Sequence, residues 1–250
     1  MTKKKISIII PARLKSSRFP NKVLVKIFGL PMIEHVRRRA LMSKYVDKVV
    51  VATPDLKIQK IIKKNNGLCI RTYKHHISGT SRVAEACKQI DSSHIIILQG
   101  DEPLINPKEI DSLIKKMINS KSKIFNCIGN INKSELTDNS VVKAIIDKNK
   151  NICSCFRDYK NNYNKKNYKL FGVMGFEKEI LLKLMTLKPS KNEKKYKIEQ
   201  LRIIDNKFLM KSFLIKGTSA SVNFKKDLIT IKKDLKNDKN QNVIFNKIIV

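Results

Sequence analysis

A basic turn follows directly after the first apolar run of the chain, in the stretch IIIPARLKSSRFPNK at residues 8–22. It carries four cations, Arg13, Lys15, Arg18 and Lys22, and no acid. Cations and exposed backbone N–H groups at the end of a buried strand are typical of a phosphate site. Arg13 offers a bidentate fork and Lys22 a point charge, so together they predict a clamp on a polyphosphate. A solvated basic loop is the alternative, which we favour for the lysines alone but not for Arg13 and Arg18.

A second polar cluster, LQGDEPLI at residues 98–105, follows another apolar run. Asp101 and Glu102 place carboxylates there, and a carboxylate that faces a cationic turn suits Mg²⁺ held between protein and phosphate oxygens. The amide of Gln99 could read the edge of a base. In isolation, Asp101 could equally cap a turn or helix. The glycines match neither GxGxxG nor GxxxxGK[ST], so two common nucleotide motifs are poor matches.

The third cluster is HHISGTSR at residues 75–82. Gly79 permits close approach of the backbone to a ligand. Ser78 and Thr80 could hydrogen-bond a base or ribose, and Thr80 could instead cap the following helix. His75 and His76 are candidate general bases, although we favour the reading that they are ordinary loop histidines.

Strands and helices alternate along the first half of the chain, which predicts a parallel, doubly wound sheet. Ligands of such sheets bind outside the carboxyl ends of the strands, where the basic turn and the LQGDEPLI segment both lie. The expected strands are 6–10, 48–53, 68–72 and 94–100, and the expected helices are 31–43, 54–67, 81–90 and 106–119.

The second half is less regular. We expect a hairpin over 141–156 with its turn at Asp147–Asn151, and a polar loop at 161–167. Further strands are expected at 168–176 and 208–215, and helices at 178–187, 195–205 and 225–238. The tail after Asn237 ends in the apolar VIFNKIIV, which could pack on the body or on a second subunit.

The composition excludes several classes of protein. The formal charge of +32 comes almost entirely from lysine spread along the chain, without an aromatic stacking platform, so we expect no nucleic-acid partner. There is no apolar run of 18 residues, and we read the N-terminus as a first strand and not a signal peptide. Five cysteines without a CxxC pair indicate reduced thiols in a cytoplasmic protein and no zinc site.

Four segments resemble, in order and at similar distances, the 3-deoxy-manno-octulosonate (Kdo) cytidylyltransferases. They are IIIPARLKSSRFPNKVLVKIFGLPMIEHVRRRA, HHISGTSR, QGDEPLI and IEQLR. The resemblance spans residues 6 to about 235. It implies a Mg²⁺-dependent reaction in which CTP and a 3-deoxy-2-ulosonic acid give the CMP-sugar and pyrophosphate. The 2-hydroxyl of the sugar would attack the α-phosphorus, which is mostly a matter of positioning and charge neutralisation.

The resemblance also implies residue roles. Arg13 and Lys22 would hold the phosphates, and Asp101 would bind Mg²⁺ and share the catalytic role with them. Cytosine and ribose would be held by Ala12, Ser78, Gly79 and Gln99. The sugar acid would be held by Arg157, Glu199 and Gln200, with Arg157 on its carboxylate.

Three positions depart from the family pattern. Asn223, in GTSASVNFKKDL at 217–228, stands where a second metal-binding aspartate is expected, so it would be an uncharged and weaker ligand. Leu170 stands where a histidine is expected beside the sugar, and Ser140 where an asparagine is usual. These changes lie on the sugar and second-metal side, so the nucleotide is the firmer part of the prediction.

We therefore expect an α/β cytidylyltransferase with a doubly wound, mostly parallel sheet of the nucleotide-diphospho-sugar transferase type. It would form one domain over 1–237, with a β-rich dimerisation insertion at about 130–190 and a tail at 238–250. We expect a cytoplasmic homodimer without membrane insertion, whose product feeds lipopolysaccharide or another surface glycan. The alternatives are an enzyme for a different sugar acid, a nucleotide-binding relative that has lost turnover, and a charge-driven nucleic-acid-binding protein with a steep salt dependence.

Overall fold

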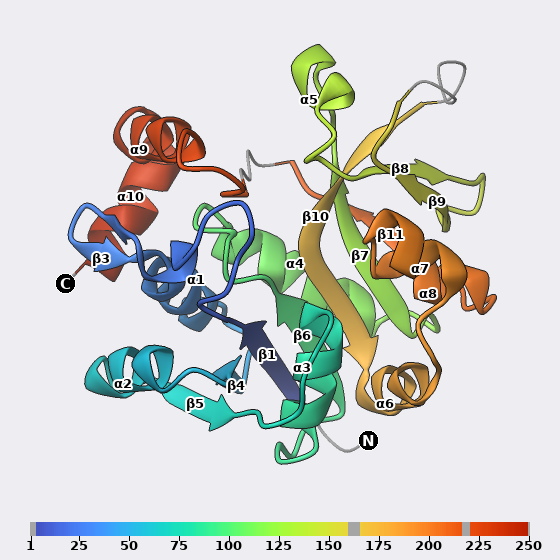
Figure 1. The fold of residues 1–250 in the computed structure, drawn as a ribbon, viewed down its shortest axis with the longest axis horizontal. Helices are drawn as coiled ribbons and strands as arrows, with labels where there is room; N and C mark the ends of the chain where they lie inside the picture. The colour runs from blue at the N-terminus through green and yellow to red at the C-terminus, as the bar shows by residue number, and fades with distance from the viewer. Residues whose placement is uncertain (1–3, 160–165, 217–220, 250) are drawn as a thin grey trace.

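A twisted, mostly parallel sheet forms the centre of the protein and carries helices on both faces (Figure 1). The structure, a computed structural model, describes residues 4–159, 166–216 and 221–249. Within these residues the main path of the sheet runs β11-β7-β10-β6-β1-β4-β5, and β8 and β9 extend it from β10. The strands are β1 Ile6–Pro11, β4 Lys48–Thr53, β5 Leu68–Arg71, β6 His94–Leu98, β7 Ile124–Gly129, β8 Lys143–Ile146, β9 Ile152–Phe156, β10 Tyr168–Glu177 and β11 Lys211–Leu214.

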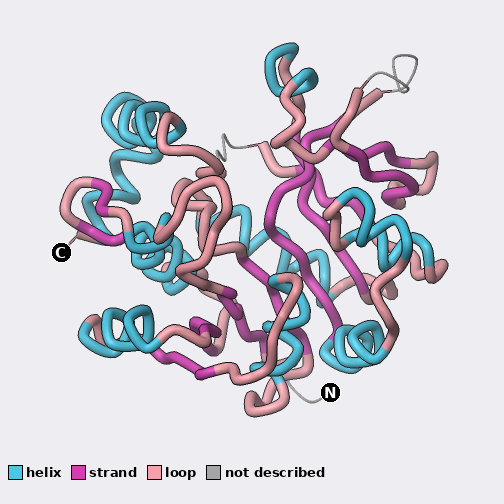
Figure 2. Tube along the Cα trace, viewed as in Figure 1, coloured by secondary structure: helices cyan, strands magenta, loops and turns pink. Residues whose placement is uncertain are grey.

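The expected doubly wound arrangement is confirmed. The helices are α1 Met32–Leu41, α2 Leu56–Lys64, α3 Gly79–Cys87, α4 Pro107–Ile118, α5 Lys133–Thr137, α6 Lys178–Thr186, α7 Lys191–Tyr196, α8 Gln200–Asp205, α9 Asp227–Asn237 and α10 Lys239–Ile248. Figure 2 shows them in cyan on both sides of the magenta strands. Among the described residues, none of the helices has both the length and the apolar character that crossing a membrane requires.

The all-apolar sequence of β1 follows from burial on both faces. Ile8 and Ile10 pack into a cluster with side chains of α1, α2, α4 and α9, whereas Ile9 faces a second cluster with side chains of α3 and α6. β1 pairs in parallel with β4 and with β6. The carboxyl ends of β1 and β6 therefore lie side by side, which brings the basic turn next to the LQGDEPLI segment.

Two features of the sheet were not part of the sequence prediction. β7, a fully buried strand beside β10, was not predicted, because the buried Asn126 interrupts its apolar run. β10 runs antiparallel to β6, β7 and β8, since the direction of a strand is not encoded in its own pattern. Smaller elements were also missed: α5, the hairpin of β2 (Lys26–Ile27) and β3 (Leu30–Pro31), and the 3₁₀ turn η1 (Lys22–Leu24), in which Lys22 lies.

The helix predicted over 195–205 is in fact two helices. α7 ends before Lys197, whose φ of 55° is left-handed, and α8 begins at Gln200. The predicted hairpin of β8 and β9 is present, and it rises with α5 from the end of the sheet (Figure 1). Most of the polar loop predicted at 161–167 lies outside the described residues.

The C-terminal segment expected as a tail forms α10 and packs on the body, which was one of the two alternatives. Phe245 stacks on the ring of His35 in α1, with ring centroids 5.7 Å apart and an interplanar angle of 5°. Arg38 donates from Nη1 to the carbonyl oxygen of Ile248 at the helix end (2.5 Å). Gln241 donates to the carbonyl oxygen of Leu104 (2.9 Å). α10 is therefore part of the folded domain.

Candidate functional site

Two adjoining cavities open at the carboxyl ends of β1 and β6. The smaller, of about 250 Å³, lies inside the basic turn, and the larger, of about 920 Å³, extends toward β8, β10 and α8. Both are lined by Arg13, Arg18, Ser78, Gly79, Gln99 and Asp101. A smaller and a larger compartment therefore share one wall. All eleven sequence-predicted site residues line at least one of the two cavities.

Lys22 and Asp101 form an ion pair in the smaller cavity. Lys22 also donates from Nζ to the carbonyl oxygen of Val222 (3.0 Å). Arg13, Lys15 and Arg18 are exposed around this pair. The structure thus brings Lys22 of the predicted phosphate clamp into direct contact with Asp101, the predicted metal ligand. The sequence analysis did not predict this contact.

The backbone of the basic turn is largely used within the protein. Ala12 donates its N–H to the carbonyl oxygen of Ala52 (2.9 Å), and Leu14 donates to the carboxylate of Asp55 (2.9 Å). Those two N–H groups are therefore engaged, and the side-chain cations are the groups that this part of the turn presents to a phosphate. Asp55, from the end of β4, fixes the start of the turn.

Arg82 is a cation of the smaller cavity that the sequence analysis missed. Only 5% of its surface is exposed, and its Nη1 donates to Thr72 Oγ1 (2.5 Å). Burial, and then the charge of Arg13, lower the pKa of Arg82. The signal was present in the sequence, because Arg82 follows Gly79 by one helical turn and therefore lies on the same side of α3.

Gly79 lies tightly against the amide of Gln99. A Cβ atom at position 79 would stand 2.7 Å from Gln99 Nε2 and 3.0 Å from Oε1, closer than ordinary contact. The close approach predicted for this glycine is thus made to a side chain of the site. Ser78, not Thr80, caps α3, since its hydroxyl accepts from the N–H of Ser81 (3.2 Å).

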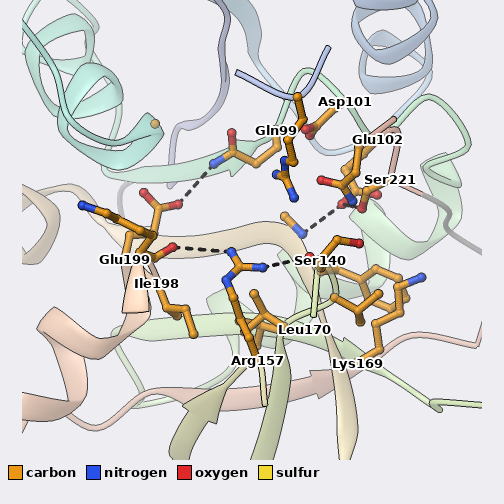
Figure 3. Close-up of a pocket in the computed structure, with 18 of the residues that line it drawn as sticks. Gln99, Asp101, Glu102, Ser140, Arg157, Lys169, Leu170, Ile198, Glu199 and Ser221 are labelled. Atoms are coloured by element: carbon orange, nitrogen blue, oxygen red, sulfur yellow. Dashed lines mark hydrogen bonds between the residues drawn. The ribbon is translucent and has the colours of Figure 1, made fainter. Parts of the chain in front are cut away.

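Glu199 joins this cluster from the other side of the site. Its Oε1 accepts from Gln99 Nε2 (3.2 Å) and its Oε2 from the N–H of Thr80 (3.1 Å), as Figure 3 shows for the bond to Gln99. Burial raises the pKa of Glu199, and the bond from Thr80 opposes the rise. Glu199 was expected on the sugar acid, and the structure places it where the two compartments meet.

Neither of the two loop histidines lines either cavity. His76 bonds through Nε2 to Glu85 (2.6 Å) and through Nδ1 to Ser81 (3.2 Å). Burial is the main cause that lowers the pKa of His76. His75 is exposed and lines neither cavity. The ordinary-loop reading of these residues agrees with this geometry.

The segment that carries Asn223 lies beside Asp101. Val222 donates its N–H to the carbonyl oxygen of Asp101 (2.9 Å), and the N–H of Asn223 is held by Asp227 (2.7 Å). Asp101 and Asn223 both line the larger cavity. Among the residues that the structure describes, His, Cys, Asp and Glu side chains do not gather in threes that could hold a metal ion. One carboxylate and one amide are few ligands for Mg²⁺, so water, together with phosphate oxygens when a nucleotide is bound, would complete its coordination.

Glu102, the acid next to Asp101 in the sequence, is buried and bonded to groups within the protein. Only 1% of its surface is exposed, and its Oε1 accepts from Ser221 Oγ (2.7 Å) and from the N–H of Gly172 (3.0 Å). Figure 3 labels Glu102 and Ser221 on the same side of the cavity. Glu102 therefore ties β10 and the 221–223 segment to the end of β6.

Arg157 projects into the larger cavity from the end of β9 (Figure 3). Its Nη1 donates to the carbonyl oxygens of Ser140 (2.9 Å) and Asn139 (3.2 Å), and its Nη2 to that of Lys197 (3.5 Å). Burial, and then the charge of Arg18, lower the pKa of Arg157. Ser140 thus orients Arg157 through its backbone, so the change from the family's asparagine at this position leaves that contact available.

Lys143 is a fully buried cation beneath Arg157 that the sequence analysis did not single out. Its Nζ donates to the carbonyl oxygens of Arg157 (2.8 Å) and Asp138 (2.6 Å). Burial lowers the pKa of Lys143. This lysine connects the strand that ends at Arg157 with the turn that holds the guanidinium.

Gln200 completes the side of the larger cavity near α8. It is buried, and its Nε2 donates to Asn126 Oδ1 (3.1 Å) on the unpredicted strand β7. Leu170 lines the same cavity and adds an apolar surface to a wall that is otherwise rich in charge. The predicted sugar-side residues therefore line one compartment, which also contains Lys169 and Glu135 as an ion pair (2.7 Å).

Comparison with known proteins finds similar sequences and similar structures. A sequence model of the cytidylyltransferase family matches residues 7–213. The 3-deoxy-manno-octulosonate cytidylyltransferases of Pelobacter propionicus and Geobacter sulfurreducens are 42% identical over 117 residues and 44% identical over 109 residues. These matches cover 47% and 44% of this chain and 46% and 44% of the relatives, so the chain spans about half the length of the curated relatives it matches.

Solved structures match over a longer stretch. CMP:2-keto-3-deoxy-manno-octonic acid synthetase complexed with CTP superposes with a TM-score of 0.84 at 30% identity, covering 91% of this chain and 97% of that chain. A cytidylyltransferase from Leptospira borgpetersenii superposes with a TM-score of 0.66 at 18% identity, covering 98% of this chain and 94% of that one. The second likeness shows the fold alone.

Proposed function

Since the chain belongs to the cytidylyltransferase family, we propose that it transfers CMP from CTP to a 3-deoxy-2-ulosonic acid, Kdo or a close relative, and releases pyrophosphate. The observation that carries this proposal is the pair of adjoining cavities. The smaller has the size and positive charge that a triphosphate needs, and the larger presents a guanidinium for a carboxylate. The segments that resemble the Kdo enzymes line both cavities.

The nucleotide is held by groups from three elements. Arg13 and Lys22 bind the phosphates from the basic turn, with Arg82 behind them on α3. Gln99 presents its amide to the cytosine, and Ser78, Gly79 and the backbone at Ala12 complete the base and ribose site. The bond from Gln99 to Glu199 fixes which way the amide points, and base recognition requires that orientation.

The sugar acid occupies the larger cavity. Arg157 binds its carboxylate as a bidentate partner, because its guanidinium is already oriented by neutral carbonyl oxygens. Glu199 and Gln200 bind hydroxyl groups. Their positions place the sugar against the α-phosphorus of a nucleotide that extends into the smaller cavity.

The reaction follows from this placement. The oxygen of the sugar's 2-hydroxyl forms a bond to the α-phosphorus, the bond from that phosphorus to the bridging oxygen breaks, and pyrophosphate leaves with the electron pair. The hydroxyl proton passes to solvent or to a phosphate oxygen. Lys22 and Arg13 stabilise the charge that grows on pyrophosphate, and Arg157 holds the acceptor in line. Mg²⁺, held by Asp101 and Asn223 together with phosphate oxygens, would neutralise further negative charge.

We also propose a cytoplasmic homodimer that pairs through the region of about 130–190 and supplies a surface glycan such as lipopolysaccharide. The five free cysteines agree with a reducing compartment. The region of α5, β8 and β9 stands out from the rest of the sheet and offers a surface for a second copy (Figure 1). Sedimentation of the purified protein tests the dimer, and a monomer at micromolar concentration would contradict it.

Pyrophosphate release from CTP, with and without Kdo and across several Mg²⁺ concentrations, tests the proposed activity. We expect release that depends on both CTP and the sugar acid, with CTP preferred over ATP and GTP. An Asp101→Asn variant should lose release while keeping its circular dichroism spectrum. Equal binding of all three nucleotides in calorimetry would contradict the assignment of the base site.

A different sugar acid is a second candidate substrate, because the apolar Leu170 lies in the cavity wall where the resemblance leads us to expect a histidine. An assay of Kdo-like and nonulosonic acids with CTP separates the candidates. If CTP binds but none of the acids supports pyrophosphate release, the chain is a nucleotide-binding relative that has lost turnover.

A further inference from the structure

The ion pair between Lys22 and Asp101 joins two groups that the proposed function assigns to different parts of the bound substrate. Lys22 belongs to the phosphate clamp and Asp101 to the metal site. In the structure they form an ion pair, with 13% of the lysine side chain and 24% of the aspartate side chain exposed. Each group is therefore the charged partner of the other.

The surroundings of the pair disfavour a bare metal ion. Arg13, Lys15 and Arg18 line the same small cavity, so a divalent cation would enter a region that is already positive. It would also have to displace the ammonium group from Asp101, and a half-buried charged hydrogen bond is harder to replace than an exposed one. A triphosphate removes both obstacles, because it supplies negative charge and a competing partner for Lys22.

Lys22 also orders the second metal-side segment. Its bond to the carbonyl oxygen of Val222, and the bond from Val222 N–H to the carbonyl oxygen of Asp101, hold this segment beside the end of β6. Asn223 is the next residue. The departure of Lys22 would therefore uncover Asp101 and the Val222 carbonyl oxygen at the same time, on the side where Asn223 lies.

We propose that Lys22 stands in for the divalent cation at Asp101 in the ligand-free protein and moves to the phosphates when the nucleotide enters. Binding of the metal at Asp101 then depends on the nucleotide. This inference rests on the proposed function for the identity of the nucleotide. It assigns Lys22 a second role, which is to keep the metal site closed until the substrate is present.

Manganese binding in the absence of nucleotide tests the proposal, with Mn²⁺ as a spectroscopic probe for Mg²⁺. Free Mn²⁺ is measured by electron paramagnetic resonance for wild type, Lys22→Met and Lys22→Gln. We expect both variants to bind Mn²⁺ about tenfold more tightly than wild type, because one charged hydrogen bond no longer competes. Adding Asp101→Asn to either variant should abolish the gain.

Lys26→Met is the matched control. It removes the same charge from an exposed residue four positions later that lines neither cavity. A gain in this control equal to that in the Lys22 variants would mean that net charge alone is responsible, and it would overturn the proposal. Unchanged Mn²⁺ affinity in the Lys22 variants would overturn it as well.

Two further measurements keep the outcomes distinct. Circular dichroism shows whether each variant is folded. If Lys22→Met is not folded, Lys22→Gln replaces it in the test, because a glutamine can still donate a hydrogen bond to the Val222 carbonyl oxygen. Pyrophosphate release by wild type tests the proposed function separately, because the Mn²⁺ titration uses neither CTP nor a sugar acid. If wild type releases no pyrophosphate, the Mn²⁺ titration still shows whether Lys22 competes with a divalent cation for Asp101.

Discussion

Replacing Gly79 with alanine should weaken the binding of CTP far more than it changes the stability of the fold. The new Cβ atom would stand 2.7 Å from Gln99 Nε2, so the amide must retreat by about 0.7 Å to reach an ordinary contact of 3.4 Å. That retreat strains the 3.2 Å bond from Gln99 to Glu199. The amide that we place on the cytosine would thus lose both its position and its orientation.

The magnitude follows from the number of bonds affected. Loss of one or two neutral hydrogen bonds to the base should cost about 1–2 kcal/mol of binding free energy, which raises the dissociation constant for CTP by about 5- to 30-fold. The fold should tolerate the change, because the two closest atoms are the far end of the flexible Gln99 side chain and the contact to Pro11 Cγ, at 3.1 Å, needs a shift of only a few tenths of an ångström. We therefore expect the midpoint of thermal unfolding to shift by no more than about 4 °C.

Calorimetry with CTP on Gly79→Ala, Gln99→Ala and the double variant measures this directly. In the double variant the colliding amide is gone, so Gly79→Ala should add little to the effect of Gln99→Ala, and the two effects should not sum. Full additivity would show that position 79 acts without Gln99. Wild-type affinity in the single Gly79→Ala variant would refute the assignment of Gln99 to the base.

Four further outcomes are expected. Lys22→Ala should lower turnover by about 10²-fold or more while circular dichroism stays unchanged, and wild-type turnover would remove Lys22 from the phosphate clamp. Asn223→Asp should lower the Mg²⁺ concentration for half-maximal rate, since it adds a carboxylate at similar volume, and an unchanged requirement would place Asn223 outside the metal site. Lys143→Met should raise KM for the sugar acid without altering the affinity for CTP, because it releases the strand end at Arg157, and equal loss of both would indicate general unfolding. The free energy of unfolding should fall as the pH drops from about 6.5 to 4, because burial lowers the pKa of His35 to about 4 and only the unfolded chain gains that proton in this range. The loss is at most roughly 3 kcal/mol. Denaturant titrations of wild type and His35→Gln measure it, and parallel pH profiles of the two proteins would contradict the expectation.

The parallel half of the sheet could be predicted because its strands are buried on both faces. Continuous apolar sequences such as ISIII and HIIIL have few other stable solutions, and the parallel order then places the ends of β1 and β6 together. β7 escaped prediction because the side chain of Asn126 is buried through bonds that no local pattern reveals, to the carbonyl oxygens of Phe171 and Cys127. The carbonyl oxygen of Phe171 becomes a partner only once β10 has paired beside β7.

The composition of the site was more predictable than its contacts. Residue types and strand ends were enough to place Arg13, Gln99 and Asp101 around one opening. Lys22 and Asp101 are 79 positions apart in the sequence, and their pairing depends on the direction that a flexible lysine side chain takes in the folded protein. The pattern of residue types around each of them carries no information on that direction. Arg82 and Lys143 were missed for a related reason, because burial makes them significant and burial is a property of the folded chain.

The break in the helix predicted over 195–205 connects the two halves of the site. In a continuous helix the carbonyl oxygen of Lys197 would accept from the N–H of Leu201, but that N–H bonds to Ile198 instead (3.2 Å). The left-handed Lys197 turns the chain, so its carbonyl oxygen faces Arg157 on the sugar side. Two residues later Glu199 reaches Gln99 on the nucleotide side. A left-handed lysine is strained by about 1–2 kcal/mol, and the contacts on both sides of the turn offset that strain. One short turn thus fixes the acceptor guanidinium and the base-reading amide relative to each other, as transfer between two bound substrates requires.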